Sequence, residues 1–147
     1  AERKIRSTKL KQRERVGEGA YGVIYKALYR QRARAGSSKS IVVAVKSLQF
    51  ADEPGVYQDY CREVVAMRHL PDDPRLTSFI GFTAPNELSL VMEFVPHGTL
   101  YDLLHDKSRK LTWQFRMRIA IDVARGVAAM HAVRPALLHR DLKSPNV

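Results

Sequence analysis

Residues 139–146, HRDLKSPN, bring a carboxylate, an ammonium and a carboxamide close together: Asp141, Lys143 and Asn146. A carboxylate can accept the proton of a hydroxyl, a cation can stabilise a developing negative charge, and an amide oxygen can bind Mg²⁺. Phosphoryl transfer asks a protein mainly for positioning and charge neutralisation, so this set of groups suits that chemistry. A charged surface loop after a helix is the alternative interpretation.

A glycine-rich stretch lies near the start of the chain, in RVGEGAYGVIYKALYR, residues 15–30. Its G-x-G-x-x-G pattern occurs in two unrelated phosphate-binding designs. In a dinucleotide-binding fold the glycines would lead into a helix. Here β-branched and aromatic residues follow, so we expect two strands joined by a glycine-rich turn. Glycines in such a hairpin let backbone N–H groups approach phosphates closely.

Lys46 is a lone charge near the end of an apolar run, SIVVAVKSLQF, residues 40–50. This valine-rich run predicts a strand that is covered on both faces. A buried lysine needs an anion beside it, and Glu63 on the following helix is the nearest candidate. The alternative is a lysine whose stem is buried while its ammonium group stays in water.

The elements that must position these groups follow from periodicity. Residues 56–70 form a predicted amphipathic helix that is closed by Pro71, with Glu63 beside its apolar stripe. Segments 75–82 and 88–95 are predicted to form an antiparallel strand pair. The first two thirds of the chain is therefore expected to be a mainly antiparallel sheet with one helix. The apolar stripe of the helix consists of Tyr60, Val64, Met67 and Leu70.

The chain changes character at residues 94–98, where we expect a hinge. Thr99 and Asp102 predict the start of a short helix that runs to about residue 105. Thr112 is expected to cap a longer helix that reaches about residue 131. The stripe of the longer helix consists of Phe115, Ile119, Val123, Val127 and Met130.

Composition bounds the remaining possibilities. The chain has 147 residues, is 45% hydrophobic and does not begin with Met, so we expect a globular piece of a longer polypeptide. No apolar run approaches the roughly 20 residues of a membrane span, and the basic N-terminus lacks the apolar core of a signal peptide. We therefore expect a soluble protein of the cytoplasm, with the nucleus as an alternative.

The cysteine and histidine residues and the distribution of charge argue against a disulfide, a metal site and a nucleic-acid site. Cys61 is the only cysteine, so the chain has no internal disulfide, and a half-buried thiol is favoured over a reactive one. The five histidines lack the spacing of metal ligands. Much of the net charge of +10 lies in residues 3–15 and 29–40, and the second stretch is expected to be a loop. Neither stretch interleaves aromatic residues, so solvated surface is favoured over a nucleic-acid site.

Taken in order, GEGAYGVI, VAVK, Glu63 on the next helix and HRDLKSPN resemble the catalytic domain of the eukaryotic protein kinases, over nearly all of the chain. The resemblance implies an α+β protein kinase-like fold with two lobes, here truncated. An antiparallel sheet lobe with one long helix would be followed by the first helices of a mostly helical lobe. The implied divisions are a basic extension, 1–9, the N-terminal lobe, 10–95, and the start of the C-terminal lobe, 96–147.

The same resemblance implies ATP and Mg²⁺ as the cofactors and assigns roles. Lys46, paired with Glu63, would contact the α- and β-phosphates. Asp141 would be the catalytic base, Lys143 would steady the γ-phosphate, and Asn146 would hold Mg²⁺. The implied ATP-binding residues are Val16, Gly17, Glu18, Gly19, Ala20, Tyr21, Gly22, Val23, Ile24, Ala44, Lys46, Met92, Glu93 and Val95.

Several of these positions have more specific implied roles. Met92 would be the gatekeeper at the back of the adenine pocket, although its pattern alone is that of a core residue. The backbone from Glu93 to Val95 would bind the adenine edge. His139 and Arg140 would organise the site, and Arg140 resembles the arginine that pairs with an activation-loop phosphate.

Lys143 after Asp141 and Leu142 is the pattern of Ser/Thr kinases, and LKSPN with FIGF resembles the tyrosine kinase-like group. The expected partner is therefore a protein substrate with a Ser or Thr acceptor. No oligomeric state follows from the sequence.

The chain also departs from the kinase pattern, because no Asp-Phe-Gly motif is present. We expect these 147 residues alone to be inactive while the parent polypeptide is active, and to leave apolar helical surface exposed. The alternative is a pseudokinase that acts as a nucleotide-binding or allosteric scaffold. Intact Lys46, Glu63, Asp141 and Asn146 argue against it.

Overall fold

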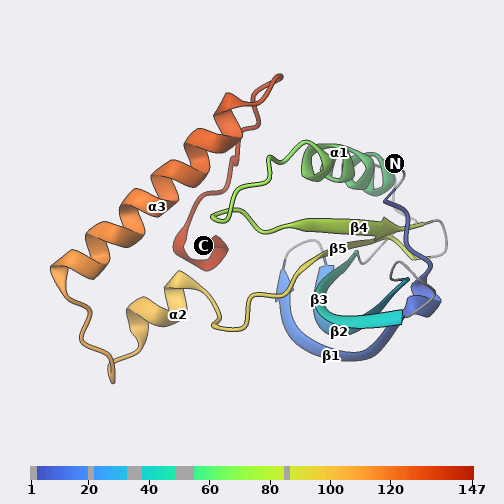
Figure 1. The fold of residues 1–147 in the computed structure, drawn as a ribbon, viewed down its shortest axis with the longest axis horizontal. Coiled ribbons are helices and arrows are strands. Elements are labelled where there is room, and N and C mark those ends of the chain that lie inside the picture. The colour runs from blue at the N-terminus through green and yellow to red at the C-terminus, as the bar shows by residue number, and fades with distance from the viewer. Residues whose placement is uncertain (1–2, 20–21, 33–37, 49–54, 85–86) are drawn as a thin grey trace. The chain divides into compact units, whose positions relative to one another are not determined.

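The computed structural model describes residues 3–19, 22–32, 38–48, 55–84 and 87–147. The chain divides into two compact units, whose elements are labelled in Figure 1. The sheet unit comprises Ala1–Arg68 and Ser78–Phe94, and the helical unit comprises His69–Thr77 and Val95–Val147. The α+β class expected from the sequence is confirmed.

A five-stranded antiparallel sheet forms the sheet unit, in the order β1-β2-β3-β5-β4. The first two strands pair from Leu10↔Tyr29 to Gly19↔Gly22, so the glycine-rich stretch is a hairpin, as its composition predicts. β5 pairs with both β3 and β4, which places the predicted second strand pair beside the valine-rich strand. The strands are β1 Leu10–Gly19, β2 Gly22–Arg32, β3 Ser38–Leu48, β4 Phe79–Thr83 and β5 Ser89–Glu93.

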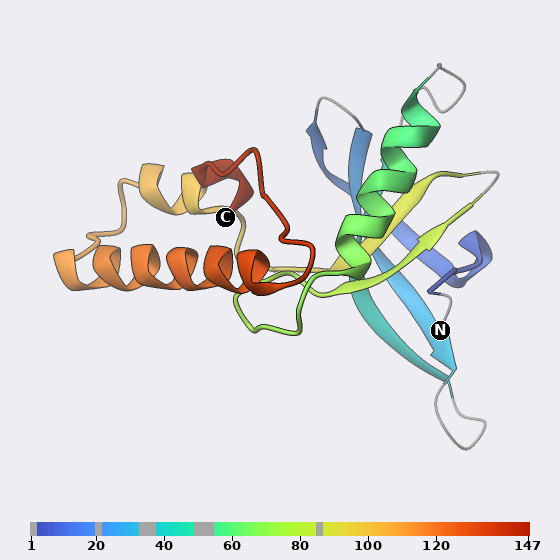
Figure 2. The ribbon, with the colours of Figure 1, turned by 90° about the horizontal axis from the view of Figure 1, so that it is seen from above.

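One face of β3 is buried, whereas Val42 on the other face is 44% exposed, so the predicted cover on both faces is wrong at that position. Val43 and Val45 are 0% exposed and pack with Ile5, Leu10 and Val91 in one core cluster. The helix α1, Val56–Arg68, builds a second cluster against the β4–β5 hairpin (Figure 2). The second cluster consists of Tyr60, Val64, Phe79, Leu88 and Leu90.

The predicted helical stripe is therefore largely confirmed. Tyr60 and Val64 are buried, and Met67 packs against the same cluster. The Tyr60 hydroxyl donates a hydrogen bond of 2.5 Å to the Thr83 carbonyl oxygen, which ties α1 to β4. Burial raises the pKa of Tyr60, so its hydroxyl remains a donor.

A short N-terminal segment, residues 3–9, lies against β4, and we call it the strap. Its Lys4 forms an isolated parallel bridge with Phe82. The backbone N–H of Ile5 donates to the Phe82 oxygen at 2.7 Å, and the Phe82 N–H donates to the Arg3 oxygen at 3.0 Å. A Cβ at Gly81 would overlap the Arg3 carbonyl and the Ile5 side chain. The strap ends in the 3-10 turn η1, Ser7–Lys9.

Two element boundaries predicted from the sequence are wrong. The loop expected over residues 29–40 is shorter, because the pairs Arg30↔Ser40 and Arg32↔Ser38 continue the β2–β3 ladder. The remaining loop, 33–37, lies outside the described residues. The strand expected from residue 75 begins only at Phe79. Asp73 accepts hydrogen bonds from the Arg75 backbone and side chain and so holds a turn there.

Helices dominate the described part of the other unit: α2 Leu100–His105, α3 Trp113–Ala132 and the 3-10 turn η2 Ser144–Asn146. Both predicted caps are present. Thr99 and Asp102 form a reciprocal capping box, and Thr112 Oγ1 accepts from the Phe115 N–H at 3.2 Å. Among the described residues, no helix is long and apolar enough to cross a membrane.

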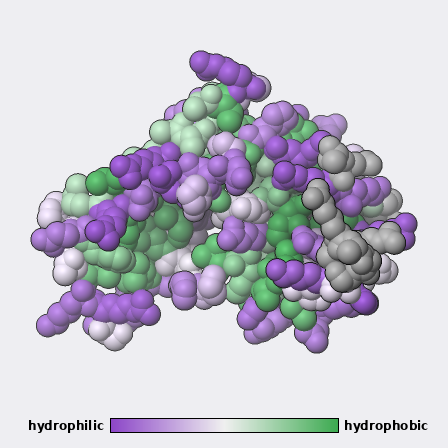
Figure 3. All heavy atoms as spheres, in the orientation of Figure 1, coloured by the Kyte–Doolittle hydropathy of each residue, from purple (hydrophilic) through white to green (hydrophobic). Residues whose placement is uncertain are grey.

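One side of α3 packs and another remains exposed. Gly126 and Met130 are buried, and a Cβ at Gly126 would lie 3.5 Å from Arg75 and Leu76 side-chain atoms. Trp113 is 71% exposed. The expected apolar surface is therefore present beside α3 (Figure 3). It includes a hollow of 620 Å³ whose lining contains Leu100, Leu104, Ile119, Val123, Val127 and Leu142.

Candidate active site

Lys46 and Glu63 form a hydrogen-bonded ion pair in the sheet unit. The Lys46 Nζ donates to Glu63 Oε1 at 2.6 Å, so the pairing expected from the sequence is present. The two side chains are 24% and 37% exposed. Solvent therefore still reaches the pair, which contributes only about 0–1 kcal/mol to stability. Its importance lies in where it holds the ammonium group.

The position of this pair follows from the fold of β3 and α1. Side chains alternate along a strand, so Lys46 faces away from the cluster that contains Val45. Lys46 lies opposite Leu90, which packs beneath α1. Tyr60 anchors that helix one turn before Glu63. Packing of α1 in the hydrophobic core therefore holds the Glu63 carboxylate next to the Lys46 ammonium group.

The pairing of the strands places three further residues that are expected to bind ATP near Lys46. Ile24 lies opposite Lys46, and Ala44 lies opposite Met92. Directly opposite residues share a face of the sheet, so these side chains line the face that carries Lys46. Val23 is buried and, by strand alternation, faces the other side. The structure therefore separates Val23 from this group.

The glycine-rich hairpin lies at the adjoining ends of β1 and β2. Gly17 pairs with Ile24, and Gly19 pairs with Gly22. A Cβ at Gly22 would overlap the Ser47 carbonyl oxygen, a close approach that the sequence does not reveal. Glu18 forms an exposed ion pair with Arg15. The expected site residues Ala20 and Tyr21 lie outside the described residues.

The remaining expected ATP-binding residues occupy less enclosed positions. Val16 lies at an irregularity in the β1–β2 register and is exposed. Glu93 is the last residue of β5, and its backbone N–H donates to the Ser78 oxygen at 2.9 Å. Val95 is exposed and is assigned to the helical unit.

Asp141, Lys143 and Asn146 interact directly in the helical unit. Lys143 Nζ lies 3.0 Å from Asp141 Oδ2. Asn146 Nδ2 donates to the Asp141 backbone oxygen at 2.8 Å and to Oδ2 at 2.9 Å. The hydrogen bond from Lys143 and then that from Asn146 lower the pKa of Asp141. The carboxylate is therefore ionised at neutral pH.

The backbone of this loop is unusual at Arg140, where φ is +62°. Non-glycine residues rarely adopt this left-handed conformation, and such strain concentrates at functional sites. The Asp141 N–H donates to His139 Nδ1 at 3.4 Å, which supports the turn. Sequence reasoning missed this strained residue, because arginine carries no compositional signal for positive φ.

The loop carries oxygen atoms of the kind that can bind Mg²⁺. Because Asn146 uses its amide nitrogen on Asp141, its amide oxygen is the group left for a cation. Carboxylate and amide oxygens suit Mg²⁺, which usually keeps several waters and phosphate ligands as well. Among the described residues, no group of three or more His, Cys, Asp or Glu side chains could hold a metal ion.

Comparison with known proteins places the chain in a family. The family described as "Protein tyrosine and serine/threonine kinase" matches residues 10–147. The chain is 36% identical over 134 residues to the probable serine/threonine-protein kinase roco5 of Dictyostelium discoideum, covering 91% of the chain and 5% of that protein.

Two further similar proteins are also named as probable serine/threonine-protein kinases. The probable serine/threonine-protein kinase SIS8 of Arabidopsis thaliana is 38% identical, with 91% of the chain and 12% of that protein covered. The probable serine/threonine-protein kinase drkA of Dictyostelium discoideum is 35% identical, with 90% and 20% covered. The chain thus spans a small part of each of these relatives, and it belongs to the protein tyrosine and serine/threonine kinase family.

Proposed function

We propose that this chain is part of the catalytic domain of a kinase that transfers the γ-phosphoryl group of ATP to Ser or Thr hydroxyls of proteins. The observation that carries the proposal is the Lys46–Glu63 ion pair, since it holds a half-buried ammonium ready for an anion. Family membership and the kinase names of the relatives support it.

In the sheet unit, Lys46 is proposed to bind the α- and β-phosphates. Glu63 keeps the ammonium in place, since a lysine side chain is otherwise flexible. The glycine-rich hairpin, residues 17–22, would offer backbone N–H groups to the phosphates. Ala44 and Met92, paired on the Lys46 face, would line the adenine. Val16, Val23, Glu93 and Val95 remain proposed ATP-binding residues that the geometry supports less directly.

In the helical unit, Asp141 is proposed to orient the acceptor hydroxyl and take its proton. Its lowered pKa keeps it ionised, so it accepts the proton only as the oxygen becomes bonded to phosphorus. Lys143 would stabilise the charge on the transferred group, and Asn146 would contribute its amide oxygen to Mg²⁺. Bound Mg²⁺ would neutralise phosphate charge and orient the phosphoryl group.

Substrate class and subgroup rest on the sequence of the same loop. Lys143 in LKSPN supports Ser/Thr specificity, and together with FIGF, residues 79–82, it supports membership of the tyrosine kinase-like group. We further propose that residues 10–95 and 96–147 are parts of the two kinase lobes, and that the protein acts in the cytoplasm or nucleus.

The test is phosphotransfer by the purified parent polypeptide from radiolabelled ATP to a generic Ser/Thr substrate, since these 147 residues alone are proposed to be inactive. Lys46→Met and Asp141→Asn should each lower kcat/KM by about 10²-fold or more. Lys39→Met removes an exposed lysine from the same strand and should leave the rate unchanged. Products containing only phosphotyrosine would refute Ser/Thr specificity. Nucleotide binding without any transfer by the unaltered parent polypeptide would favour the pseudokinase alternative.

A further inference from the structure

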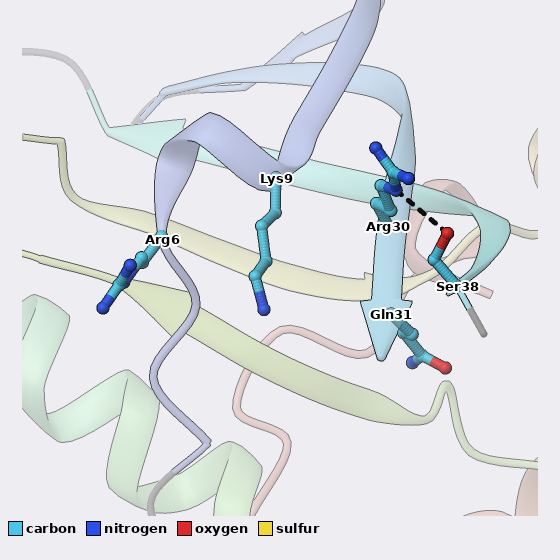
Figure 4. Close-up of a pocket in the computed structure, with 5 residues that line it drawn as sticks. All are labelled: Arg6, Lys9, Arg30, Gln31 and Ser38. Carbon is cyan, nitrogen blue, oxygen red and sulfur yellow. Dashed lines mark hydrogen bonds between the residues drawn. The ribbon is translucent and has the colours of Figure 1, made fainter. Parts of the chain in front are cut away.

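A pocket of 480 Å³ lies in the sheet unit on the Lys9 side of the strap (Figure 4). We call it the basic pocket, because three of its described lining residues are cations and none of these described residues is acidic. The lining residues are Arg6, Lys9, Arg30, Gln31 and Ser38. In the view of Figure 4, Lys9 stands between Arg6 on one side and Arg30 with Ser38 on the other.

The fold holds two of these cations on one short turn. Ile5 and Leu10 are both buried, and they flank the turn that carries Arg6 and Lys9. The Lys9 N–H donates to the Arg6 oxygen at 2.9 Å and closes that turn. The strap hydrogen bonds to Phe82 anchor its other end. Both side chains therefore emerge from a positioned backbone rather than from a free terminus.

The third cation comes from another part of the sheet. Arg30 lies near the end of β2, and its Nε donates to Ser38 Oγ at 3.1 Å. Ser38 begins β3, so this bond spans the β2–β3 ladder. It uses one guanidinium nitrogen and leaves two others for a ligand.

Two neighbouring arginines are paired with carboxylates, unlike the three cations of the basic pocket. Arg13 and Arg15 on β1 form ion pairs with Glu87 and Glu18. Within the described part of the chain, no carboxylate forms an ion pair with Arg6, Lys9 or Arg30, so the three cations raise the local potential without internal compensation.

We propose that the basic pocket binds a compact, multiply phosphorylated ligand, the chemistry shared by soluble inositol polyphosphates and phosphoinositide headgroups. Three cations around one hollow can each meet a different phosphate on a small ring. Gln31 and Ser38 supply neutral polar groups for ring hydroxyls. Among the residues that the structure describes, the lining contains no aromatic side chain to stack on a base and no apolar side chain to receive a peptide, which disfavours nucleic acid and phosphopeptide ligands.

This proposal does not depend on the catalytic one, because the residues are different. The probe is myo-inositol hexakisphosphate, titrated into the purified protein by calorimetry at physiological salt. We expect micromolar binding that weakens as salt rises. The pocket variant Arg6→Gln/Lys9→Gln/Arg30→Gln should weaken binding at least about 100-fold. The matched control Lys107→Gln/Lys110→Gln/Arg118→Gln removes the same charge from exposed positions of the helical unit and should bind normally.

Vesicles distinguish the two sources of the ligand. Sedimentation with phosphatidylcholine vesicles, with and without phosphatidylinositol bisphosphate, reports whether a headgroup in a membrane can enter the pocket. Binding in either arm that the pocket variant loses supports the proposal. Should the triple variant unfold in a thermal melt, Lys9→Gln alone must weaken binding about tenfold.

Several results would overturn the proposal. One is no binding in either arm at physiological salt. A second is equal weakening by the control variant, which would mean that only net charge matters. A third is tighter binding of a phosphoserine peptide or of single-stranded DNA than of the inositol phosphate.

Discussion

Gly81→Ala should detach the strap from β4. A Cβ at this position would overlap the Arg3 carbonyl oxygen and the Ile5 side chain, and backbone cannot move aside cheaply. The two hydrogen bonds between the strap and Phe82 would be lost, and Ile5, which is 5% exposed, would reach solvent. The substitution therefore tests whether the strap is an integral part of the sheet unit.

The expected cost follows from these contacts. Two backbone hydrogen bonds contribute about 1–3 kcal/mol together, and burial of the isoleucine side chain contributes about 1.5–3 kcal/mol. The conformational freedom that the strap regains offsets part of this loss. We expect a net destabilisation of about 2 kcal/mol, which lowers Tm by about 10 °C for a unit of this size.

Hydrogen exchange and a double-mutant cycle give the decisive measurements. The amides of Ile5 and Phe82, which donate the two hydrogen bonds, should lose protection in Gly81→Ala. The same substitution should cost almost nothing in a protein that lacks residues 1–6, because Arg3 and Ile5, which a Cβ at Gly81 would meet, are then absent. An equal cost in both backgrounds, or unchanged protection of Ile5, would refute the reasoning.

Three further predictions concern local contacts. Glu87→Gln should cost about 1 kcal/mol at pH 7, since Arg13 lowers the pKa of Glu87. The lowered pKa means that this contribution is complete above the ordinary value of about 4.3 and is lost as pH falls through the folded-state value. In urea unfolding, the free energies of unfolding of Glu87→Gln and of the unaltered protein should therefore differ by more at pH 7 than at pH 3. Equal differences at the two pH values would contradict this. Gly126→Ala should stabilise α3 by up to about 1 kcal/mol, since its Cβ would make ordinary contacts at 3.5 Å; a lower Tm would contradict this. Thr99→Ala removes the capping box of α2 and should cost about 1 kcal/mol by thermal melting, while Thr77→Ala, an exposed control, should not.

Much of the fold is predictable because its signals are local. The glycines between two β-branched segments predict the β1–β2 hairpin, and the valine-rich run predicts the strand β3, although only the face with Val43 and Val45 is fully buried. Thr99 and Thr112 predict two helix starts, since a side-chain oxygen is needed where backbone N–H groups lack partners. Boundaries fail where pairing overrides composition, as in residues 29–32, whose basic character suggests a loop although they continue the β2 ladder.

The candidate site likewise has a part that the sequence predicts and a part that depends on the tertiary structure. Sequence order is enough to nominate Asp141, Lys143 and Asn146, because the three lie in one loop and meet by proximity along the chain. The Lys46–Glu63 partnership could be suggested but not positioned, since its geometry depends on how α1 packs over the hairpin. Strain at Arg140 has no sequence signal.

The sequence by itself determined the strands, the helix starts and the kinase motifs, because turn glycines, capping residues and apolar periods act within a few residues. Tertiary structure alone decided that the strap lies on β4, that Gly81 and Gly22 must lack a Cβ, and that Arg6, Lys9 and Arg30 share one pocket. Those features join residues far apart in the chain, and only the packing of whole elements fixes such distances.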